Sequence, residues 1–164
     1  MTSRVYLSLG SNVEAEKNIR LSIRQLRAIF GDLVLSPVYE SASFGFEGDD
    51  FLNLAGGFDT DLGVSEVVEQ LRGIEDRLGR DRTQARFSKR PIDLDILLYD
   101  DLELNISGIQ IPRHEILERA YVLKPLSDIA PQVLHPIIHQ SFQILWLAMA
   151  PEAPRLALYP LVLD

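Results

Sequence analysis

The sequence predicts a single α+β domain built around a β-α-β-β-α-β core of the ferredoxin-like kind. Its 164 residues, of which 46% are hydrophobic, are enough for one well-packed core and few for two. Apolar residues repeat with a period of about 2 in some segments and about 3.6 in others, as strands and helices require. These segments alternate in the stated order through residue 99. In folds with this order, the helices pack on one face of an antiparallel sheet.

The first half of the core is a strand, a helix and two further strands. Residues 4–12 alternate in hydrophobicity and end in Gly-Ser-Asn, as a strand that enters a turn does. Apolar residues then recur at helical spacing over 19–30, and Gly31 ends the helix. Residues 33–41 and 51–62 are predicted to be two separate extended segments, because a stretch rich in glycine and aspartate, with loop composition, divides them.

The second half of the core adds a helix and a strand. Apolar side chains recur at helical spacing over 64–78 until Gly79, a basic loop follows, and residues 92–99 form the next strand. Beyond the core we expect two short strands, a helix, an extended segment and a last amphipathic helix, at residues 102–106, 109–112, 113–120, 121–126 and 140–150. These additional C-terminal strands and helices extend the core fold.

Charge and composition exclude several classes of function. The formal net charge of -8 argues against a basic surface of the kind that neutralises the phosphates of a nucleic acid. We therefore expect no nucleic-acid partner. The chain contains no cysteine, which excludes disulfides, thiolate nucleophiles and cysteine-based zinc sites and fits a reducing compartment. The N-terminal residues lack the apolar core of a signal peptide, and the apolar run ILWLAMA is too short to span a bilayer. We therefore expect a cytoplasmic protein without membrane contact.

Two aspartates, Asp93 and Asp95, stand one residue apart in the predicted strand of RPIDLDILLYDD. Alternation along a strand points both carboxylates to one face, where charges about 7 Å apart repel by about 2.4 kcal/mol at an effective dielectric constant of about 20. For an isolated pair, a solvated face of an edge strand is the more common explanation. Proteins usually hold Mg²⁺ with one or two carboxylates and substrate phosphates, and a basic segment immediately precedes this pair. We therefore favour a magnesium site.

The basic segment is the second candidate feature. Residues 72–90 hold seven cations against three acids, a net charge of +4. Arginines at a helix end can simply interact with the helix dipole, but this number beside two carboxylates exceeds that need. Arginine binds phosphate oxygens through two donors, and phosphoryl transfer depends mainly on positioning and charge stabilisation. The sequence has no P-loop, dinucleotide-binding glycine motif or protein-kinase H-R-D motif, so these arginines are the predicted phosphate-binding groups.

Two further features are weaker. Phe51 and Asn53 share a strand face after a glycine-containing loop, and an aromatic ring beside an amide suits a flat polar heterocycle. A core phenylalanine beside a turn-forming asparagine is the more common explanation of such a pair. His135 and His139 have the spacing of a helical metal site, but Pro136 lies between them, so a structural or surface role is favoured.

Together these motifs resemble those of the 6-hydroxymethyl-7,8-dihydropterin pyrophosphokinases, folate-pathway enzymes also called 2-amino-4-hydroxy-6-hydroxymethyldihydropteridine diphosphokinases. The resemblance covers nearly the whole chain, through LSLGSN, FLNLA, IEDRLGRDR, RPIDLDILLYDD and IPRHEILERAYVLKPLSDIAP. The central block with its two aspartates is its most specific part. The resemblance implies one pterin pyrophosphokinase domain over residues 1–164. Such a domain transfers the β,γ-diphosphate of ATP to the hydroxymethyl oxygen of the dihydropterin and releases AMP, with two Mg²⁺ ions.

The resemblance also implies roles for individual residues. Asp93 and Asp95 correspond to the metal-binding pair, and together with Arg80 and Arg90 they form the expected catalytic group. The expected nucleotide-binding residues are Arg72, Glu75, Arg82, Phe87, Ile96, Arg113, His114 and Arg119. The expected pterin-binding residues are Ser41, Phe44, Phe51, Asn53 and Tyr121, with the rings of Phe51 and Tyr121 on opposite sides of the pterin. We expect a monomer that binds two small molecules.

The chain departs from the family pattern at several positions. The family usually has Arg-Trp-Gly-Pro-Arg before the aspartates, where residues 86–90 read Arg-Phe-Ser-Lys-Arg. Arg113 stands where the family usually has a histidine, and residues 41–43 read Ser-Ala-Ser in place of Thr-Pro-Pro. Two other functions therefore stay open. One is a diverged relative that binds a pteridine or a nucleotide with weak or altered activity. The other is a non-catalytic ferredoxin-like module for RNA or an effector, whose RNA form the acidic net charge opposes.

Overall fold

The central sheet has the strand order β5-β1-β4-β3-β8, and β2 pairs with β4 beside this path. The computed structural model describes residues 1–41, 50–79 and 90–163. The strands span Ser3–Ser11 (β1), Val34–Leu35 (β2), Val38–Ser41 (β3), Phe51–Thr60 (β4), Asp93–Tyr99 (β5) and Ala157–Tyr159 (β8). All of these pairings are antiparallel. With β1 between β5 and β4, and β3 beyond β4, the order confirms the predicted ferredoxin-like core.

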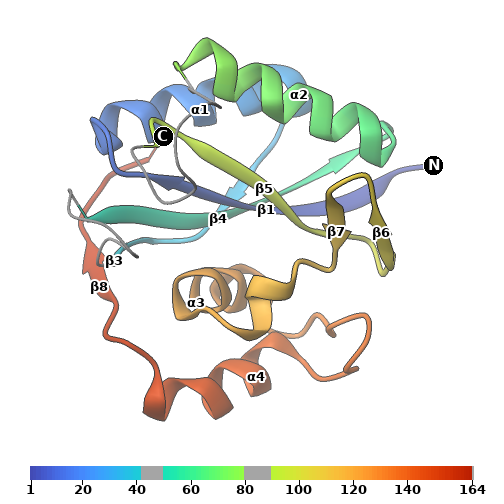
Figure 1. Cartoon of the computed structure of the whole chain (residues 1–164), viewed down its shortest axis with the longest axis vertical. Coiled ribbons are helices and arrows are strands. Elements are labelled where there is room, and N and C mark those ends of the chain that lie inside the picture. Colours follow the sequence, from blue (N-terminus) through green and yellow to red (C-terminus); the bar gives the residue numbers. More distant parts are fainter. Residues whose placement is uncertain (42–49, 80–89, 164) are drawn as a thin grey trace.

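One face of the sheet is covered by α1 (Ala15–Phe30) and α2 (Val64–Arg77), the two helices of the core (Figure 1). Each helix carries apolar residues at a spacing of about 3.6, so that one stripe faces the strands. The buried side chains of this first core include Val5, Leu7 and Leu9 of β1, Ile19, Ile23 and Leu26 of α1, and Val67, Leu71 and Ile74 of α2. The strand β1 therefore directs its odd-numbered apolar residues toward these two helices.

The opposite face is covered by the C-terminal extension (Figure 1). Its helices are the 3₁₀ helices η1 (His114–Leu117) and η2 (Ala150–Glu152) and the α-helices α3 (Ala120–Ile129) and α4 (Phe142–Met149). α3 lies against the sheet, and α4 packs on α3. A second core forms here from Leu97, Leu98, Ile116, Val122, Leu123, Leu126 and Phe142. Helices thus cover both faces, whereas the core pattern alone places them on one.

Two predictions for the extension are wrong. Residues 121–126 are not extended but belong to α3, and residues 113–120 are not one helix but η1 followed by the start of α3. Pro125 and the β-branched Val122 made this short apolar run resemble a strand, and apolar runs of this length do not separate helix from strand by periodicity. In the fold, Pro125 lies inside α3, and burial against the second core stabilises the helix around it.

The sheet edge opposite β5 also differs from the prediction. The extended segment 33–41 is divided into β2 and β3 at Ser36 and Pro37, because proline has no N–H to continue the hydrogen-bonded ladder. The strand β8 was not predicted, and it pairs with β3 after the chain has passed α4. In the part of the chain that the structure describes, none of the helices combines the length and apolarity needed to cross a membrane.

A small hairpin lies beside the edge strand β5. Its strands are β6 (Leu104–Ile106) and β7 (Ile109–Ile111), which confirms the two short strands predicted there. The turn uses Ser107 and Gly108, both at positive φ. Two residues after β7, the backbone N–H of Arg113 donates to the carbonyl oxygen of Leu97 at 3.0 Å. This bond fixes the chain after the hairpin directly against β5.

Candidate functional site

The Gly-Ser-Asn turn at the end of β1 holds the segment that leads into β5. Asn12 and Arg90 exchange two hydrogen bonds: Asn12 N–H donates to the Arg90 carbonyl at 3.1 Å, and Arg90 N–H donates to Asn12 Oδ1 at 2.7 Å. The hydroxyl of Ser11 donates to the carbonyl of Pro91 at 2.5 Å. Because Ser11 and Asn12 are buried, these bonds fix the backbone just before the two aspartates.

Asp93 and Asp95 lie on β5 with their neighbours Leu94 and Ile96 turned into the first core. The register pairs Asp93 with Gly10 and Asp95 with Ser8 of β1. The expectation that both carboxylates share one face is thus met by strand geometry. Both are half-buried, and the side chain of Asp95 is 28% exposed.

The surroundings of Asp95 favour a cation. Burial and the neighbouring charge of Asp93 raise the pKa of Asp95 to about 8, with smaller contributions from Glu75 and Glu115, and Arg113 opposes the increase. Among the described residues, no group of three or more histidine, cysteine, aspartate or glutamate side chains is arranged to hold a metal. Two hard oxygen donors that repel each other fit a magnesium ion whose other ligands are phosphate oxygens and water. The residues present therefore fit the expected ion.

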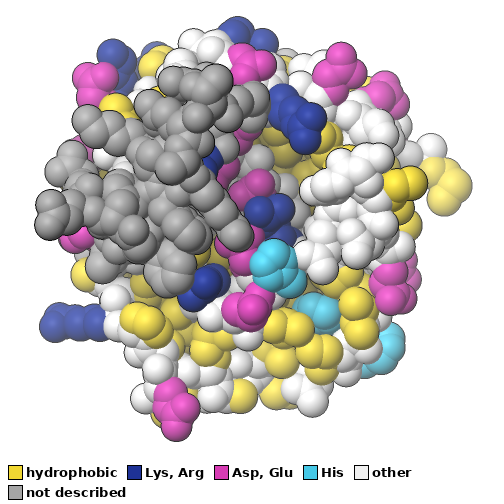
Figure 2. Space-filling view, viewed as in Figure 1, with side chains coloured by type: hydrophobic (Ala, Val, Ile, Leu, Met, Phe, Trp, Pro, Cys, Tyr) yellow, Lys and Arg dark blue, Asp and Glu magenta, His cyan; other side chains and the backbone are white. Residues whose placement is uncertain are grey.

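A pocket of about 170 Å³ opens on the outer side of β5, between α2 and the β6–β7 hairpin. It is lined by Val68, Leu71, Arg72 and Glu75 of α2, Asp93, Leu94, Asp95 and Ile96 of β5, Gly108, Ile109 and Gln110 of the hairpin, and Arg113. The buried Glu75 accepts a hydrogen bond from Leu94 N–H at 2.9 Å, which joins α2 to the edge strand. Figure 2 shows basic and acidic side chains gathered in a hollow near the centre of this face.

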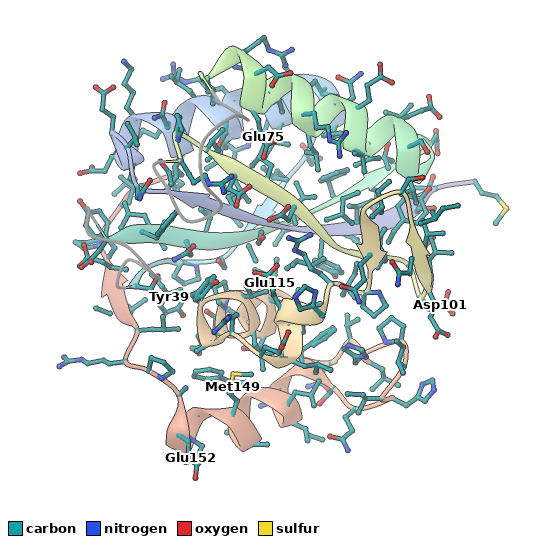
Figure 3. The ribbon with its side chains drawn as sticks, viewed as in Figure 1. Tyr39, Glu75, Asp101, Glu115, Met149 and Glu152 are labelled. Atoms are coloured by element: carbon teal, nitrogen blue, oxygen red, sulfur yellow. The ribbon has the colours of Figure 1, made fainter. Side chains whose placement is uncertain are left out.

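Arg113 forms the boundary of this pocket on the side of η1. Its Nε donates to Glu115 Oε1 at 2.7 Å, and its Nη1 lies 3.6 Å from Asp95 Oδ1. Burial alone would lower the pKa of Arg113, but the charges of Asp95 and Glu115 raise it. Figure 3 shows Glu75 on the α2 side of the sheet and Glu115 on the α3 side. The acid pair therefore lies between two further carboxylates, with Arg113 beside it.

His114 is oriented differently from Arg113. Its Nδ1 lies 2.6 Å from Gln110 Oε1, and its Nε2 lies 3.6 Å from Glu118 Oε2. Its contacts thus tie η1 to the hairpin, while Arg113 is the residue next to Asp95. Arg113 has extended backbone angles and precedes η1, whereas His114 is the first residue of η1, so the two side chains leave the backbone in different directions.

Ser41, Phe51 and Asn53, three of the candidate pterin residues, lie on the same sheet face as the acid pair. The amide of the buried Asn53 donates through Nδ2 to Ser41 Oγ at 2.8 Å, which joins β4 to β3. In register, Asn53 is opposite Gly10 of β1, and Gly10 is opposite Asp93 of β5. Phe51 precedes Asn53 by two residues on the same face. The amide and the carboxylate are therefore separated by one strand and by a residue without a side chain.

Tyr121 reaches this region from α3. Burial and the negative charges of Glu115 and Asp93 raise its pKa, and Arg119 and Arg113 oppose the increase. The phenol of Tyr121 therefore lies near enough to Asp93 and Glu115 to be affected by the negative charges of both. Of the remaining expected residues, the half-buried Arg90 precedes β5, and the half-buried Arg119 is the N-cap residue of α3.

The structure brings together most of the described candidates, and it adds others. Arg72, Glu75, Ile96 and Arg113 line one pocket with the acid pair. The expected residues Phe44, Arg80, Arg82 and Phe87 lie outside the described residues. The hairpin residues Gly108, Ile109 and Gln110 were missed by sequence reasoning. The turn at Gly108 predicts the hairpin, but no local pattern indicates that the hairpin lies beside α2.

Comparisons of the sequence with known proteins point to one family. Residues 6–131 match the model of the family described as 7,8-dihydro-6-hydroxymethylpterin-pyrophosphokinase (HPPK). The chain is 35% identical over 141 residues to the 2-amino-4-hydroxy-6-hydroxymethyldihydropteridine pyrophosphokinase of Aquifex aeolicus, which covers 85% of this chain and 88% of that protein. It is 37% identical over 137 residues to the folic acid synthesis protein FOL1 of Dictyostelium discoideum. That alignment covers 82% of this chain and 21% of the larger protein.

A comparison of structures gives the same fold. The crystal structure of Plasmodium falciparum HPPK-DHPS with pteroate superposes with a TM-score of 0.75 at 13% identity, covering 93% of this chain and 44% of that one. At this identity the likeness concerns the fold alone, and it confirms the predicted fold class. The family model covers most of the chain, and the bacterial relative aligns over nearly its whole length. This chain belongs to the 7,8-dihydro-6-hydroxymethylpterin-pyrophosphokinase family.

Proposed function

We propose that this chain is an ATP-dependent diphosphotransferase of folate biosynthesis that converts 6-hydroxymethyl-7,8-dihydropterin to its diphosphate and releases AMP. The observation that carries the proposal is the row Asp93, Gly10, Asn53 across β5, β1 and β4. This row puts a carboxylate and an amide on one face, two strands apart, which supports a proposed phosphate side at Asp93 and a proposed heterocycle side at Asn53. Its family membership, and the name of the Aquifex aeolicus relative, support the same reaction.

The site divides into a nucleotide side and a pterin side. The pocket between α2, β5 and the hairpin, lined by Arg72, Glu75 and Ile96, is the proposed nucleotide side. Ser41 and Asn53, joined by their hydrogen bond, would present amide and hydroxyl groups to the edge of the pterin. Phe51 and Tyr121 would contact its two faces, because aromatic rings favour stacking on flat heterocycles. The acid pair lies between the two sides.

Asp93 and Asp95 are the proposed ligands of two Mg²⁺ ions, together with phosphate oxygens of ATP. When bound, magnesium neutralises phosphate charge and polarises the phosphorus that is attacked. The chain itself supplies positioning and positive charge. Arg90, which the Gly-Ser-Asn turn fixes next to the aspartates, would stabilise the charge of the transferred group. Arg80, Arg82 and Phe87, outside the described residues, are proposed partners of the nucleotide through the family resemblance alone.

We further propose that residues 1–164 act as one domain, as a monomer and in the cytoplasm. The Aquifex aeolicus relative has nearly the same extent, which supports a domain that works alone. The Dictyostelium discoideum relative shows that a domain of this family also occurs within a much longer chain. Size-exclusion chromatography with light scattering would test the monomer directly.

The proposal is tested by incubating the protein with MgATP and 6-hydroxymethyl-7,8-dihydropterin and measuring AMP. We expect AMP release by the wild type and a decrease of at least about 100-fold in Asp95→Asn, because an amide replaces a proposed metal ligand. The matched control is Asp101→Asn, since Asp101 is an exposed aspartate in the turn after β5, away from Glu75 in Figure 3. It should retain activity within about twofold.

Two results would contradict this function and would select different alternatives. Measurable binding of pterin or ATP by a wild type that releases no AMP would favour a diverged relative with altered activity. Binding of neither ligand would favour a non-catalytic module. The contact of Arg113 with Asp95 is the observation that supports the first alternative, because the family usually has a histidine at this position.

A further inference from the structure

Arg113 is a cation built into the acid pair from a neighbouring element. Its backbone is fixed to β5 through the hydrogen bond to Leu97, and its guanidinium extends toward Asp95 and Glu115. The three side chains are 30%, 28% and 21% exposed for Arg113, Asp95 and Glu115. Charges that are shielded from water to this degree interact more strongly than surface ion pairs. The position of Arg113 therefore affects any cation that binds to Asp95.

The two contacts of Arg113 differ in kind. The 2.7 Å contact from Nε to Glu115 is a short, charge-assisted hydrogen bond. The 3.6 Å separation from Asp95 is too long for a hydrogen bond, so this contact is a purely electrostatic attraction. Glu115 thus holds the side chain in place, while Asp95 only attracts it. The guanidinium can leave Asp95 without losing a hydrogen bond there.

A divalent cation at Asp95 would compete with this guanidinium. Both are attracted by the same carboxylate, and two positive groups within about 4–6 Å repel each other in a partly buried site. The phosphates of a nucleotide would remove the conflict, because they supply negative charge for the metal and two acceptors for the arginine fork. Arg72 and Arg113 already line the pocket in which those phosphates are proposed to lie.

We propose that Arg113 acts as an exchangeable counter-ion of Asp95, which weakens divalent-cation binding until nucleotide phosphates draw its guanidinium away. Metal and nucleotide binding are then coupled through this residue, and by linkage each strengthens the other. The nucleotide half of this inference rests on the proposed function. The metal half concerns only the acid pair and Arg113, and it can be tested without nucleotide, pterin or turnover.

The metal half is tested by titrating the nucleotide-free protein with Mn²⁺ and following free Mn²⁺ by electron paramagnetic resonance. We expect Arg113→Gln to bind Mn²⁺ about 10-fold more tightly than the wild type. Arg113→Lys retains the positive charge and should stay close to the wild type. The matched control is Arg4→Gln, which removes an equal charge from an ion pair with Asp59 at the other end of β1.

Unchanged or weaker Mn²⁺ binding in Arg113→Gln would overturn the proposal. So would a tightened site that persists when Asp95→Asn is added, because that site would not be the acid pair. Thermal unfolding of each variant shows whether it is folded, and Arg113→Met, which also removes the positive charge, takes the place of Arg113→Gln if that variant does not fold. A wild type that fails to release AMP would refute the proposed function but leave this Mn²⁺ comparison intact.

The nucleotide half is tested with a fluorescent N-methylanthraniloyl derivative of ATP, titrated in EDTA and again in Mg²⁺. If Arg113 is drawn to the phosphates, Arg113→Gln should weaken magnesium-loaded nucleotide binding about 10-fold more than metal-free binding, because linkage requires the coupling to fall by the factor by which nucleotide-free metal binding tightens. Equal weakening in both conditions would mean that Arg113 binds nucleotide without coupling it to the metal, and this half would be overturned.

Discussion

At Gly10, the absence of a side chain leaves room for the side-chain amide of Asn53. It stands between Asp93 and Asn53 in register, at the point where the proposed phosphate and pterin sides meet. A Cβ atom here would lie 3.0 Å from Asn53 Oδ1 and 3.9 Å from Phe51 Cδ1. The first distance is shorter than ordinary van der Waals contact. Because Ser41 holds the other end of the Asn53 amide, the amide could give way only by weakening that hydrogen bond.

We expect Gly10→Ala to raise the KM for the pterin about 5–10-fold with little change in the KM for ATP. The reason is that displacement of the Asn53 amide removes roughly one hydrogen bond, about 1–1.5 kcal/mol, from pterin recognition. Steady-state AMP release at varied pterin and varied ATP measures both constants. The control is Gly56→Ala, whose added Cβ would meet Leu33, Leu35 and Leu9 at 3.6 Å, an ordinary contact. A parallel rise in both KM values would refute a specific effect on the pterin side.

The sheet face to which a side chain points was predictable wherever the alternation of side chains along a strand alone decides it. Asp93 and Asp95 share a face because β5 is a strand, and the same holds for Phe51 and Asn53 on β4. Gln110 and the contact between Arg113 and Asp95 were not predictable, since they depend on how the hairpin and η1 pack beside β5. Packing of this kind is set by contacts between distant segments, which local spacing does not contain.

At the scale of elements, the Gly-Ser-Asn turn carries a role that the isolated motif does not reveal. Its hydrogen bonds with Arg90 and Pro91 join the end of β1 to the start of β5. The register of β5 against β1 then places Asp93 beside Gly10. One turn therefore positions both the sheet edge and the acid pair.

We expect Asn12→Ala to lower the free energy of unfolding by about 1–3 kcal/mol, because it leaves the backbone N–H of Arg90 without its buried acceptor. For a chain of this size, each kcal/mol lowers Tm by about 2–4 °C. Thermal unfolding measures this change, and AMP release should decrease with it because the start of β5 loosens. Asn105→Ala, at an exposed position in β6, is the control. A Tm for Asn12→Ala no lower than that of the control would contradict this role.

Elements with a long, regular pattern were the predictable ones. The sixteen residues of α1 and the ten of β4 carry enough repeats to fix their type, and both predictions were confirmed. α3 was misread because its ten residues include Pro125 and stand between two turns. Its helical state depends on burial of Val122, Leu123 and Leu126 in the second core. The three-residue strand β8 pairs with the distant β3, and so short a segment carries no repeat that would predict this pairing.

At the scale of the whole molecule, the connection between the two helices of the second layer contains a buried histidine, and we expect its protonation to destabilise the fold. His135, 2% exposed, lies in the turn between α3 and α4 and accepts hydrogen bonds through Nδ1 from the N–H groups of Ile137 and Ile138, at 3.2 and 3.3 Å. Its ring packs edge-on against Phe142. The favoured structural role of His135 is thereby confirmed.

Protonation of His135 at Nδ1 would replace the hydrogen-bond acceptor with an N–H group that faces the N–H groups of Ile137 and Ile138. Burial and the nearby His139 lower the pKa of His135 from its ordinary value of 6.5. The folded state therefore binds this proton less readily than the unfolded state, and linkage requires stability to fall as pH decreases below about 6.5 toward the folded-state pKa. His135→Asn should remove this dependence, because an amide oxygen accepts the same hydrogen bonds without titrating. Above pH 7 the neutral histidine loses nothing, so the two proteins should differ there only by a constant packing contribution.

We thus expect the Tm of the wild type to fall further than that of His135→Asn between pH 7.5 and pH 5, which thermal unfolding at matched ionic strength measures. Other titrating groups contribute equally to both proteins, so the difference between the two curves of Tm against pH reports His135 alone. Parallel curves would show that protonation of His135 does not destabilise the fold.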